Sequence, residues 1–175
     1  MAASAYNERR AQCEAGLEIL QTDVPHAESL RDISLDEYSL HQGNLPEIIQ
    51  KRVHHVVSEI ARTLLATEYL QVEDWRGFGE CMNLSHDSLR DDYQVSSFEL
   101  DWLVDWSRSQ QGVLGARLTG AGFGGCAIAL IENTHVENFI ARLPAEYLQA
   151  TARTARCWVC EAAAGAALMP FDASA

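Results

Sequence analysis

Four glycines fall within six residues and separate two apolar segments of this chain. The run GARLTGAGFGGCAIALI, residues 115–131, has glycine at positions 120, 122, 124 and 125. Glycine adopts backbone conformations that other residues rarely reach, and it has no side chain to block an approach. The apolar run CAIALI that follows, bounded by the polar Glu132, is typical of a buried strand. The sequence therefore predicts two strands joined by a bare loop that another backbone or a phosphate can approach closely.

Two nucleotide-binding motifs share part of this spacing, but neither is complete. Gly120, Gly122 and Gly125 fit G-x-G-x-x-G, yet a dinucleotide fingerprint opens a helix and a strand is expected here. Gly120 and Gly125 also have the outer spacing of a nucleoside-triphosphate loop. Cys126 and Ala127 stand where that loop requires Lys and Ser or Thr. Taken alone, the loop is more commonly a tight connection packed against neighbouring backbone.

Length and charge restrict the class of protein. A chain of 175 residues with 47% hydrophobic content fits one domain, residues 1–175, with its own core. It has no apolar run of about 18 residues, and its start lacks the apolar region of a secretory signal, so we expect a cytoplasmic protein without a membrane partner. The formal net charge of -12 argues against nucleic acid, which is bound by clustered Lys and Arg. An anionic substrate would need a local arginine or magnesium ion.

The cysteines do not form an obvious framework. Five scattered cysteines without a secretory signal are expected to be reduced. Cys157 and Cys160 spell C-x-x-C in a strand-like run, where residues three apart point to opposite faces. We therefore expect neither a zinc site nor a redox site there.

Apolar residues at helical spacing predict five helices. These span residues 5–20, 45–70, a stretch after Asp74, 96–112, and a stretch after Thr134 that Pro144 should end or kink. Asn44 with Glu47, Ser96 with Glu99, and Thr134 with Glu137 have the spacing of capping boxes. In the third helix Trp75, Phe78 and Met82 are expected to be buried, and Gly77 with Gly79 indicates close helix packing.

Residues 21–44 are polar and broken by proline and glycine, so we expect a linker-like surface region with one helical turn at 35–40. Residues 156–161 are predicted as a last strand. The C-terminal half thus consists of strand, strand, helix and strand after a mainly helical half. This order predicts an α+β two-layer sandwich with a small, mainly antiparallel sheet packed by helices.

The junction between two of the helices, residues 82–104, is unusually polar. His86 beside Asp87 could be a base with its orienting carboxylate, but neighbours in a helix do not face each other, and such groups more often cap helices or bond to turns. Asp91 with Asp92 could hold a metal ion, although an exposed charged turn is the more common arrangement.

Three strings of this sequence together carry a family resemblance. They are YNERRAQCE near the start, SHDSLRDDYQVSSFELD, and GVLGARLTGAGFGGCAIALI. In this order they closely resemble the C-terminal half of the galactokinases, members of the GHMP kinase superfamily, over nearly the whole chain. The resemblance implies a ferredoxin-like C-terminal domain of that superfamily. It also implies ATP-dependent phosphorylation of the anomeric hydroxyl of galactose in a cleft between two domains.

The resemblance also assigns roles to two places in the chain. Tyr6 matches the tyrosine that contacts the sugar, and its ring and hydroxyl suit that role. The glycine loop matches the superfamily's third motif, near the ATP phosphate loop and the sugar pocket, and it comprises Gly120, Ala121, Gly122, Phe123, Gly124 and Gly125. Bare backbone there offers N–H groups to developing negative charge.

Other family signatures are not found in residues 1–175. These are the sugar signature rich in arginine and glutamate, the PxGxGLSSS phosphate loop, the magnesium carboxylate and the aspartate base. We therefore expect no catalytic or metal-binding residue here, no ATP or Mg²⁺ bound to this chain alone, and no activity without an N-terminal ATP- and sugar-binding domain. The chain is then a fragment or a split gene product whose interdomain face could self-associate. Phe98 also replaces a proline that is common in the family.

Three alternatives stay open from the sequence. The chain could belong to another small-molecule kinase of the GHMP superfamily, although the SHDSLRDDY string favours galactokinase. It could be a non-catalytic sugar-binding or regulatory module built on the same domain. It could also be an assembly partner that completes a separately encoded N-terminal half.

Overall fold

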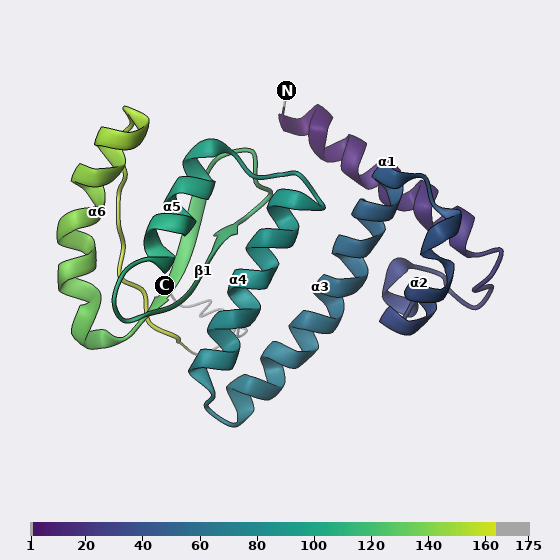
Figure 1. Cartoon of the computed structure of the whole chain (residues 1–175), viewed down its shortest axis with the longest axis horizontal. Helices are drawn as coiled ribbons and strands as arrows, with labels where there is room; N and C mark the ends of the chain where they lie inside the picture. The colour runs from purple at the N-terminus through teal and green to yellow at the C-terminus, as the bar shows by residue number, and fades with distance from the viewer. Residues whose placement is uncertain (1, 164–175) are drawn as a thin grey trace, which may run out of the picture.

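The computed structural model describes residues 2–163 (Figure 1). In chain order the main elements are α1 (Ala2–Leu20), α2 (Leu35–His41), α3 (Glu47–Gln71), α4 (Trp75–Asp91), α5 (Phe98–Arg108), β1 (Val113–Thr119), β2 (Cys126–Ile131) and α6 (Val136–Thr151). Short 3-10 turns lie at Leu30–Asp32, Gln42–Asn44 and Asn133–His135. The long helices α3 and α4 run side by side through the middle, with α1 and α2 on one side and α5, α6 and the strands on the other (Figure 1).

The sheet is a single antiparallel hairpin within the described residues. β1 pairs with β2 from Val113 opposite Ile131 to Thr119 opposite Cys126, with an irregularity between Val113 and Gly115. Both α4 and α5 pack on β1. The helix-rich α+β arrangement with a small antiparallel sheet, predicted from the sequence, is therefore confirmed.

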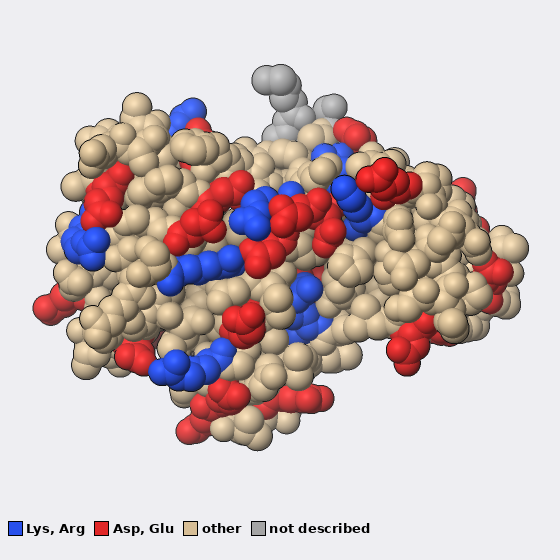
Figure 2. Space-filling view, in the orientation of Figure 1, with Lys and Arg blue, Asp and Glu red and all other residues tan. Residues whose placement is uncertain are grey.

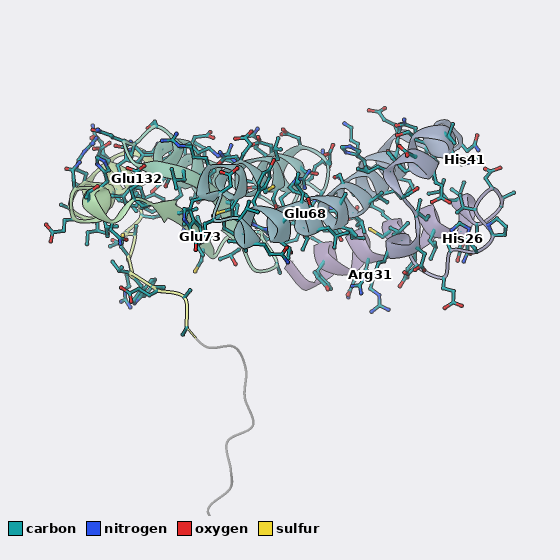
Figure 3. All side chains as sticks on the ribbon, turned by 90° about the horizontal axis from the view of Figure 1, so that it is seen from below. His26, Arg31, His41, Glu68, Glu73 and Glu132 are labelled. Atoms are coloured by element: carbon teal, nitrogen blue, oxygen red, sulfur yellow. The ribbon has the colours of Figure 1, made fainter. Side chains whose placement is uncertain are left out.

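The predicted last strand at residues 156–161 is wrong. Residues 154–163 are assigned to neither a helix nor a strand. Ala155 and Cys157 instead contact the apolar cluster of Phe139, Leu143 and Tyr147, so this segment is held by its side chains and not by a backbone ladder. Seen edge-on, the last described residues leave the flat layer of helices (Figure 3). Cys157 is half-buried and Cys160 is exposed, and all five cysteines are free.

Residues 21–44 are not a surface linker, contrary to the prediction. Their few apolar residues are turned inward and join the largest core cluster, beside Leu20, Val53 and Val57 of α1 and α3. The buried members from this segment are Val24, Ala27, Leu30, Ile33 and Tyr38. Ser34 and Glu37 form a reciprocal capping box that starts α2. Short turns thus bury widely spaced apolar residues that show no helical period.

Several helix ends differ from the capping predictions. A helix follows Asp74 as predicted, and Asp74 caps it by accepting a hydrogen bond from the Gly77 amide at 2.9 Å. Asn44 does not cap α3, because Pro46 is the capping residue and Asn44 bonds Asp23. The cap of α5 is Ser97, one residue later than predicted. No side chain caps α6, where a 3-10 turn precedes the helix.

Pro144 lies inside α6 and does not end it, because the helix continues to Thr151. A proline inside a helix removes one backbone hydrogen bond but leaves the flanking turns intact. Phe139, Leu143 and Tyr147 form one buried side of α6 against Trp102 and Trp106 of α5. This packing holds the helix together across the proline.

The glycines of α4 mark two close contacts. A Cβ atom at Gly77 would lie under 3.0 Å from the Tyr69 ring of α3, so this glycine allows the helix packing that was expected. A Cβ atom at Gly79 would lie under 3.0 Å from the carbonyl oxygen of Leu114, so this glycine faces a strand and not a helix. The strand β1 therefore lies directly on the backbone of α4.

Large apolar side chains stay exposed where α3 turns into α4. Leu64 of α3 is 65% exposed, and Val72 is 73% exposed. Trp75, predicted to be buried, is 48% exposed, whereas Met82 is buried.

Charged groups of both signs alternate across the middle of one face and form no patch of a single sign (Figure 2). In residues 2–163 none of the helices combines the length and apolar character that a membrane span requires.

Candidate functional site

The glycine loop is the turn of the hairpin. Thr119 and Cys126 are the last paired residues of β1 and β2, so residues 120–125 connect them. The predicted order of strand, glycine loop and strand is confirmed. The backbone turns through left-handed conformations, with φ of +86° at Gly120, +115° at Gly124 and +59° at Phe123. Such angles strain most side-chain-bearing residues, which explains why glycine dominates the loop.

One side of the loop is bare and the other rests on the protein. A Cβ atom at Gly120, Gly124 or Gly125 would meet nothing within 4 Å. A Cβ atom at Gly122 would lie under 3.0 Å from the carbonyl oxygen of Val95, which also accepts a hydrogen bond of 2.6 Å from the Phe123 amide. The loop is therefore anchored at its centre by Val95 and open on both flanks.

Val95 belongs to a turn, residues 92–95, that folds back on the end of α4. The amide of Tyr93 donates to the carbonyl oxygen of Ser88 at 2.9 Å, and the amide of Val95 donates to that of Leu89 at 3.0 Å. Val95 is buried with Leu89 and Leu118, and Phe123 of the loop packs against the same cluster. The 92–95 turn thus fixes the glycine loop to α4.

The helix that carries Tyr6 contacts the same turn. Arg9 of α1 donates from Nε to the carbonyl oxygen of Tyr93 at 2.7 Å and from Nη2 to that of Gln94 at 3.3 Å. Tyr6, one helical turn earlier, is 54% exposed. The structure therefore places the two predicted site elements, Tyr6 on α1 and the glycine loop, on elements that share one support. The N-terminal end of α1 and the end of α4 lie along one edge of the molecule (Figure 1).

A buried arginine supports this turn from below. Arg52 of α3 is 1% exposed, and it donates to Gln12 Oε1 at 2.8 Å, to Gln94 Oε1 at 2.7 Å and to the carbonyl oxygen of Asp92. Its partners are neutral oxygens and not a carboxylate. Burial of the guanidinium is the main cause that lowers the pKa of Arg52. Hydrogen bonds therefore hold this cation in place.

His86 holds β1 close to the loop. It is fully buried, and its Nδ1 accepts a hydrogen bond from the Leu118 amide at 3.3 Å. Burial is the main cause that lowers its pKa, and Nε2 lies 3.4 Å from Asp101 Oδ1 without a hydrogen-bond partner among the described residues. Asp87 instead accepts from Arg108 at 2.7 Å. The two residues therefore make different contacts, and His86 is buried within α4.

Asp91 and Asp92 also have separate partners. Asp91 is exposed and accepts from Arg90 at 2.9 Å, as expected of a charged turn. Asp92 accepts from Ser88 at 2.8 Å and lies 3.0 Å from His54 Nδ1. Among residues 2–163, no three His, Cys, Asp or Glu side chains come together as a metal site.

A second polar cluster lies where α3, α4 and β1 meet. Glu59 accepts from Ser85 at 2.5 Å, from Arg117 at 3.3 Å and from Arg62. It borders an open cavity of about 230 Å³ that is also lined by His55 and Tyr93. Burial lowers the pKa of His55 to about 4, so this histidine is neutral near pH 7.

Sequence reasoning missed Arg9, Arg52 and Glu59 as members of these contacts. The sequence signal for Arg9 is weak. Arg9 lies in the string YNERRAQCE, which carries the resemblance, but other charged residues flank it there. Arg52 sits beside the buried Val53 of α3, and Glu59 sits beside the half-buried Ile60. An apolar neighbour that turns toward the core is the local sign that each charged side chain turns inward.

Comparison with known proteins first defines a class. Residues 66–149 match the family model described as GHMP kinases C terminal. This stretch runs from the end of α3 through α4, α5 and the hairpin into α6, and it includes the glycine loop. This part of the chain is therefore a GHMP kinase C-terminal domain.

Within that class the chain is related to the C-terminal part of the galactokinases. It is 48% identical over 165 residues to a galactokinase of Roseiflexus sp., covering 94% of this chain and 42% of that protein. It is 37% identical over 167 residues to a galactokinase of Fusobacterium nucleatum, covering 95% of this chain and 43% of that protein. The chain therefore spans less than half the length of these curated relatives.

A solved structure agrees with this relationship. The crystal structure of Lactococcus lactis galactokinase complexed with galactose matches with a TM-score of 0.82 and 39% identity, over 86% of this chain and 39% of that chain. Phe98, noted as a departure from the family, is the first residue of α5, a position that also suits proline.

Proposed function

We propose that this chain provides the C-terminal half of an enzyme that transfers the γ-phosphoryl group of ATP to the anomeric hydroxyl of galactose. Tyr6 contacts the sugar, and residues 120–125 form one wall of the phosphate pocket. The observation that carries this proposal is the shared 92–95 turn, which contacts the Tyr6 helix through Arg9 and the glycine loop through Val95. Sugar and phosphate must be held in a fixed relation for this reaction, and one support for both elements meets that need.

The bare flanks of the loop fit the approach of a phosphate group or a phosphate-binding loop. Gly120, Gly124 and Gly125 leave more than 4 Å of open space where side chains would stand. Phosphoryl transfer also needs cations to offset charge on the transferring group. Residues 2–163 contain no group of three or more His, Cys, Asp or Glu side chains arranged for a metal ion. We assign the base and the magnesium ligands to an N-terminal half because the family signatures that carry them are not found in residues 1–175, and the same proposal includes a cytoplasmic location with access to ATP.

Complementation tests this function. The chain alone, given galactose and Mg-ATP, should form no galactose 1-phosphate above a blank. The chain co-expressed with the N-terminal part of the Roseiflexus galactokinase that it does not cover should form it steadily. Turnover by the chain alone would overturn the division of roles. A complemented pair that binds galactose but never turns over would favour a sugar-binding or regulatory module.

Tyr6 is tested in the same pair. Tyr6→Phe should raise the KM for galactose about two- to tenfold, the loss of one neutral hydrogen bond of about 0.5–1.5 kcal/mol. Tyr69→Phe is the matched control, because Tyr69 lies beside Gly77 at the far end of α3. An unchanged KM for galactose in the Tyr6 variant would remove this residue from the sugar site.

The exposed apolar residues between α3 and α4 lead us to propose that the isolated chain self-associates. Val72 and Trp75 are 73% and 48% exposed and lie close in sequence. Light scattering of the isolated chain should show a mass that rises with concentration, and the double variant Val72→Ser with Trp75→Ser should reduce it. A monomer at every concentration would show that this apolar surface does not drive association.

A further inference from the structure

We propose that Arg9 is a positioning residue that couples the sugar-contacting Tyr6 to the glycine loop through the 92–95 turn. The inference rests on the proposed function for the roles of Tyr6 and of the loop. The coupling itself rests on contacts between described residues. It predicts that a change at Arg9 is felt at the loop, although Arg9 and the loop have no direct contact among the hydrogen bonds of the structure.

Among residues 5–20 of α1, Arg9 is the first that anchors the helix to another part of the protein by hydrogen bonds. Its side chain is 12% exposed, and it bonds residues more than 80 positions away, at Tyr93 and Gln94. Tyr6 lies three residues earlier, so both side chains lie on neighbouring positions of one helix face. The apolar contacts of α1 with the core begin only at Cys13. Without Arg9, the helical turn that carries Tyr6 would extend beyond the last residue of α1 that contacts the rest of the protein.

The far side of the same turn holds the loop. The carbonyl oxygens of Tyr93 and Gln94 accept from Arg9, and the next carbonyl oxygen, that of Val95, accepts from the Phe123 amide at 2.6 Å. Three consecutive carbonyl groups therefore contact the two site elements. A backbone shift that moves the first two moves the third, because each peptide unit is planar and only φ and ψ can absorb the change.

The turn has little freedom to absorb such a shift. Gln94 has φ of +55°, a left-handed conformation that is uncommon outside glycine. Its side chain is held by Arg52 at 2.7 Å, and the Val95 amide is held by the carbonyl oxygen of Leu89 at 3.0 Å. Because hydrogen bonds hold this turn at both Gln94 and Val95, it transmits a displacement better than an unsupported loop does.

The first experiment uses the chain by itself. Amide hydrogen exchange at Phe123 reports the bond to Val95, and Arg9→Gln should speed this exchange about tenfold. Arg10→Gln is the matched control, since the neighbouring Arg10 has a side chain that is 73% exposed and pairs with Glu14 on its own helix. Its exchange at Phe123 should stay within twofold of the parent chain. Circular dichroism checks that each variant is folded.

The result that overturns the coupling is equally specific. If Arg9→Gln speeds exchange along α1 while Phe123 exchanges at its parent rate, Arg9 anchors its own helix and nothing more. If the variant unfolds, Arg9→Lys replaces it, because one ammonium group can still bond one of the two carbonyl oxygens. Exchange at Phe123 in Arg9→Lys should then lie above that of the parent, and a parent rate would again refute the coupling.

The second experiment measures kinetics in the complemented pair. Arg9→Gln should raise the KM for galactose about tenfold, with Arg9→Lys between that variant and the parent. In a Tyr6→Phe background the effect of Arg9→Gln should shrink to about threefold, since part of its action passes through Tyr6. Fully additive effects would show that Arg9 does not act through Tyr6. If the parent pair is inactive, the proposed function fails, while the exchange at Phe123 still decides the coupling.

Discussion

The glycines where β1 lies on α4 and the glycines of the hairpin turn serve opposite purposes. At the first place, a Cβ atom on Gly115 would lie under 3.0 Å from the carbonyl oxygen of Gly79, and one on Gly79 would meet Leu114 as closely. At the second, Cβ atoms on Gly120 and Gly124 would meet nothing. The first pair is required by packing. The second is required by backbone conformation and leaves a surface bare.

This difference separates stability from function within one hairpin. The closed contact brings β1 onto α4 and carries Leu118 into the core, where it is fully buried. The open turn buries little, and its flanks contribute few contacts to the folded state. A bare turn held on a rigid hairpin is a common arrangement for a binding surface. Substitutions should therefore act on stability at one place and on activity at the other.

The largest effect is expected at the closed contact. Gly115→Ala places a methyl group against backbone that cannot rotate away, so we expect a loss of about 3 kcal/mol or more in the free energy of unfolding. Urea unfolding followed by circular dichroism measures it. Gly43→Ala is the control, because a Cβ atom there meets nothing within 4 Å and the change should stay within about 0.5 kcal/mol. A loss below about 1 kcal/mol at Gly115 would show that the strand and the helix separate easily.

Gly122 combines the two cases and should have the next largest effect. Its φ is +80°, and an added Cβ atom would lie under 3.0 Å from the Val95 carbonyl oxygen. Gly122→Ala should cost about 2–3 kcal/mol, from backbone strain together with the displaced contact. Exchange at the Phe123 amide should rise with it. Parent-like exchange at Phe123 would mean that the loop moves without losing its bond to Val95.

Acid should lower the free energy of unfolding by a smaller amount, through a contact between α3 and α4. His55 of α3 bonds Ser88 of α4 at 3.0 Å. Burial, helped by repulsion from Arg62 and Arg117, lowers its pKa from 6.5 to about 4, against attraction from Glu59 and Asp92. The unfolded state binds the proton more readily, so this contribution is complete above pH 6.5 and is lost as the pH falls towards 4. The loss is about 2 kcal/mol at pH 5.

His55→Gln is the variant that tests this assignment. Glutamine cannot titrate, so the free energy of unfolding of the variant should fall less steeply between pH 7 and pH 5 than that of the parent, as measured by urea unfolding at each pH. The same slope in both proteins would assign the acid sensitivity to other groups, of which the buried His86 is one, since its pKa is also lowered by burial.

The sequence predicted the elements better than their contacts. The hairpin and its bare loop were predicted because CAIALI and the four glycines leave few alternatives over so short a span. The caps at Asn44 and Ser96 failed because spacing alone does not show which polar side chain turns back to the helix. The strand at residues 156–161 failed because a strand-like composition does not provide a partner for the backbone.

The site shows the same limit more clearly. Tyr6 and the glycine loop were predicted as site elements from strings that are contiguous in the sequence. The 92–95 turn that joins them was not, because Arg9, Arg52 and Val95 come from three separate segments. Residues 21–44 were misread as surface because a buried tyrosine or isoleucine within a polar stretch has no periodic signal. Contacts between segments that are distant in the sequence can be identified only once the fold is known.

The smallest effect on stability is expected at the open flank, where the effect on activity should be the most informative. Gly124→Ala meets no neighbouring atom, and only its φ of +115° opposes the change, so the free energy of unfolding should fall by about 1 kcal/mol. In the complemented pair, however, kcat/KM should fall at least tenfold. The added methyl group would stand on the surface that a phosphate group or a phosphate-binding loop must approach. Enzyme kinetics and urea unfolding of the same variant separate the two quantities. A variant that loses stability but keeps kcat/KM would show that the bare flank at Gly124 faces solvent and that the approach occurs at Gly120 or Gly125.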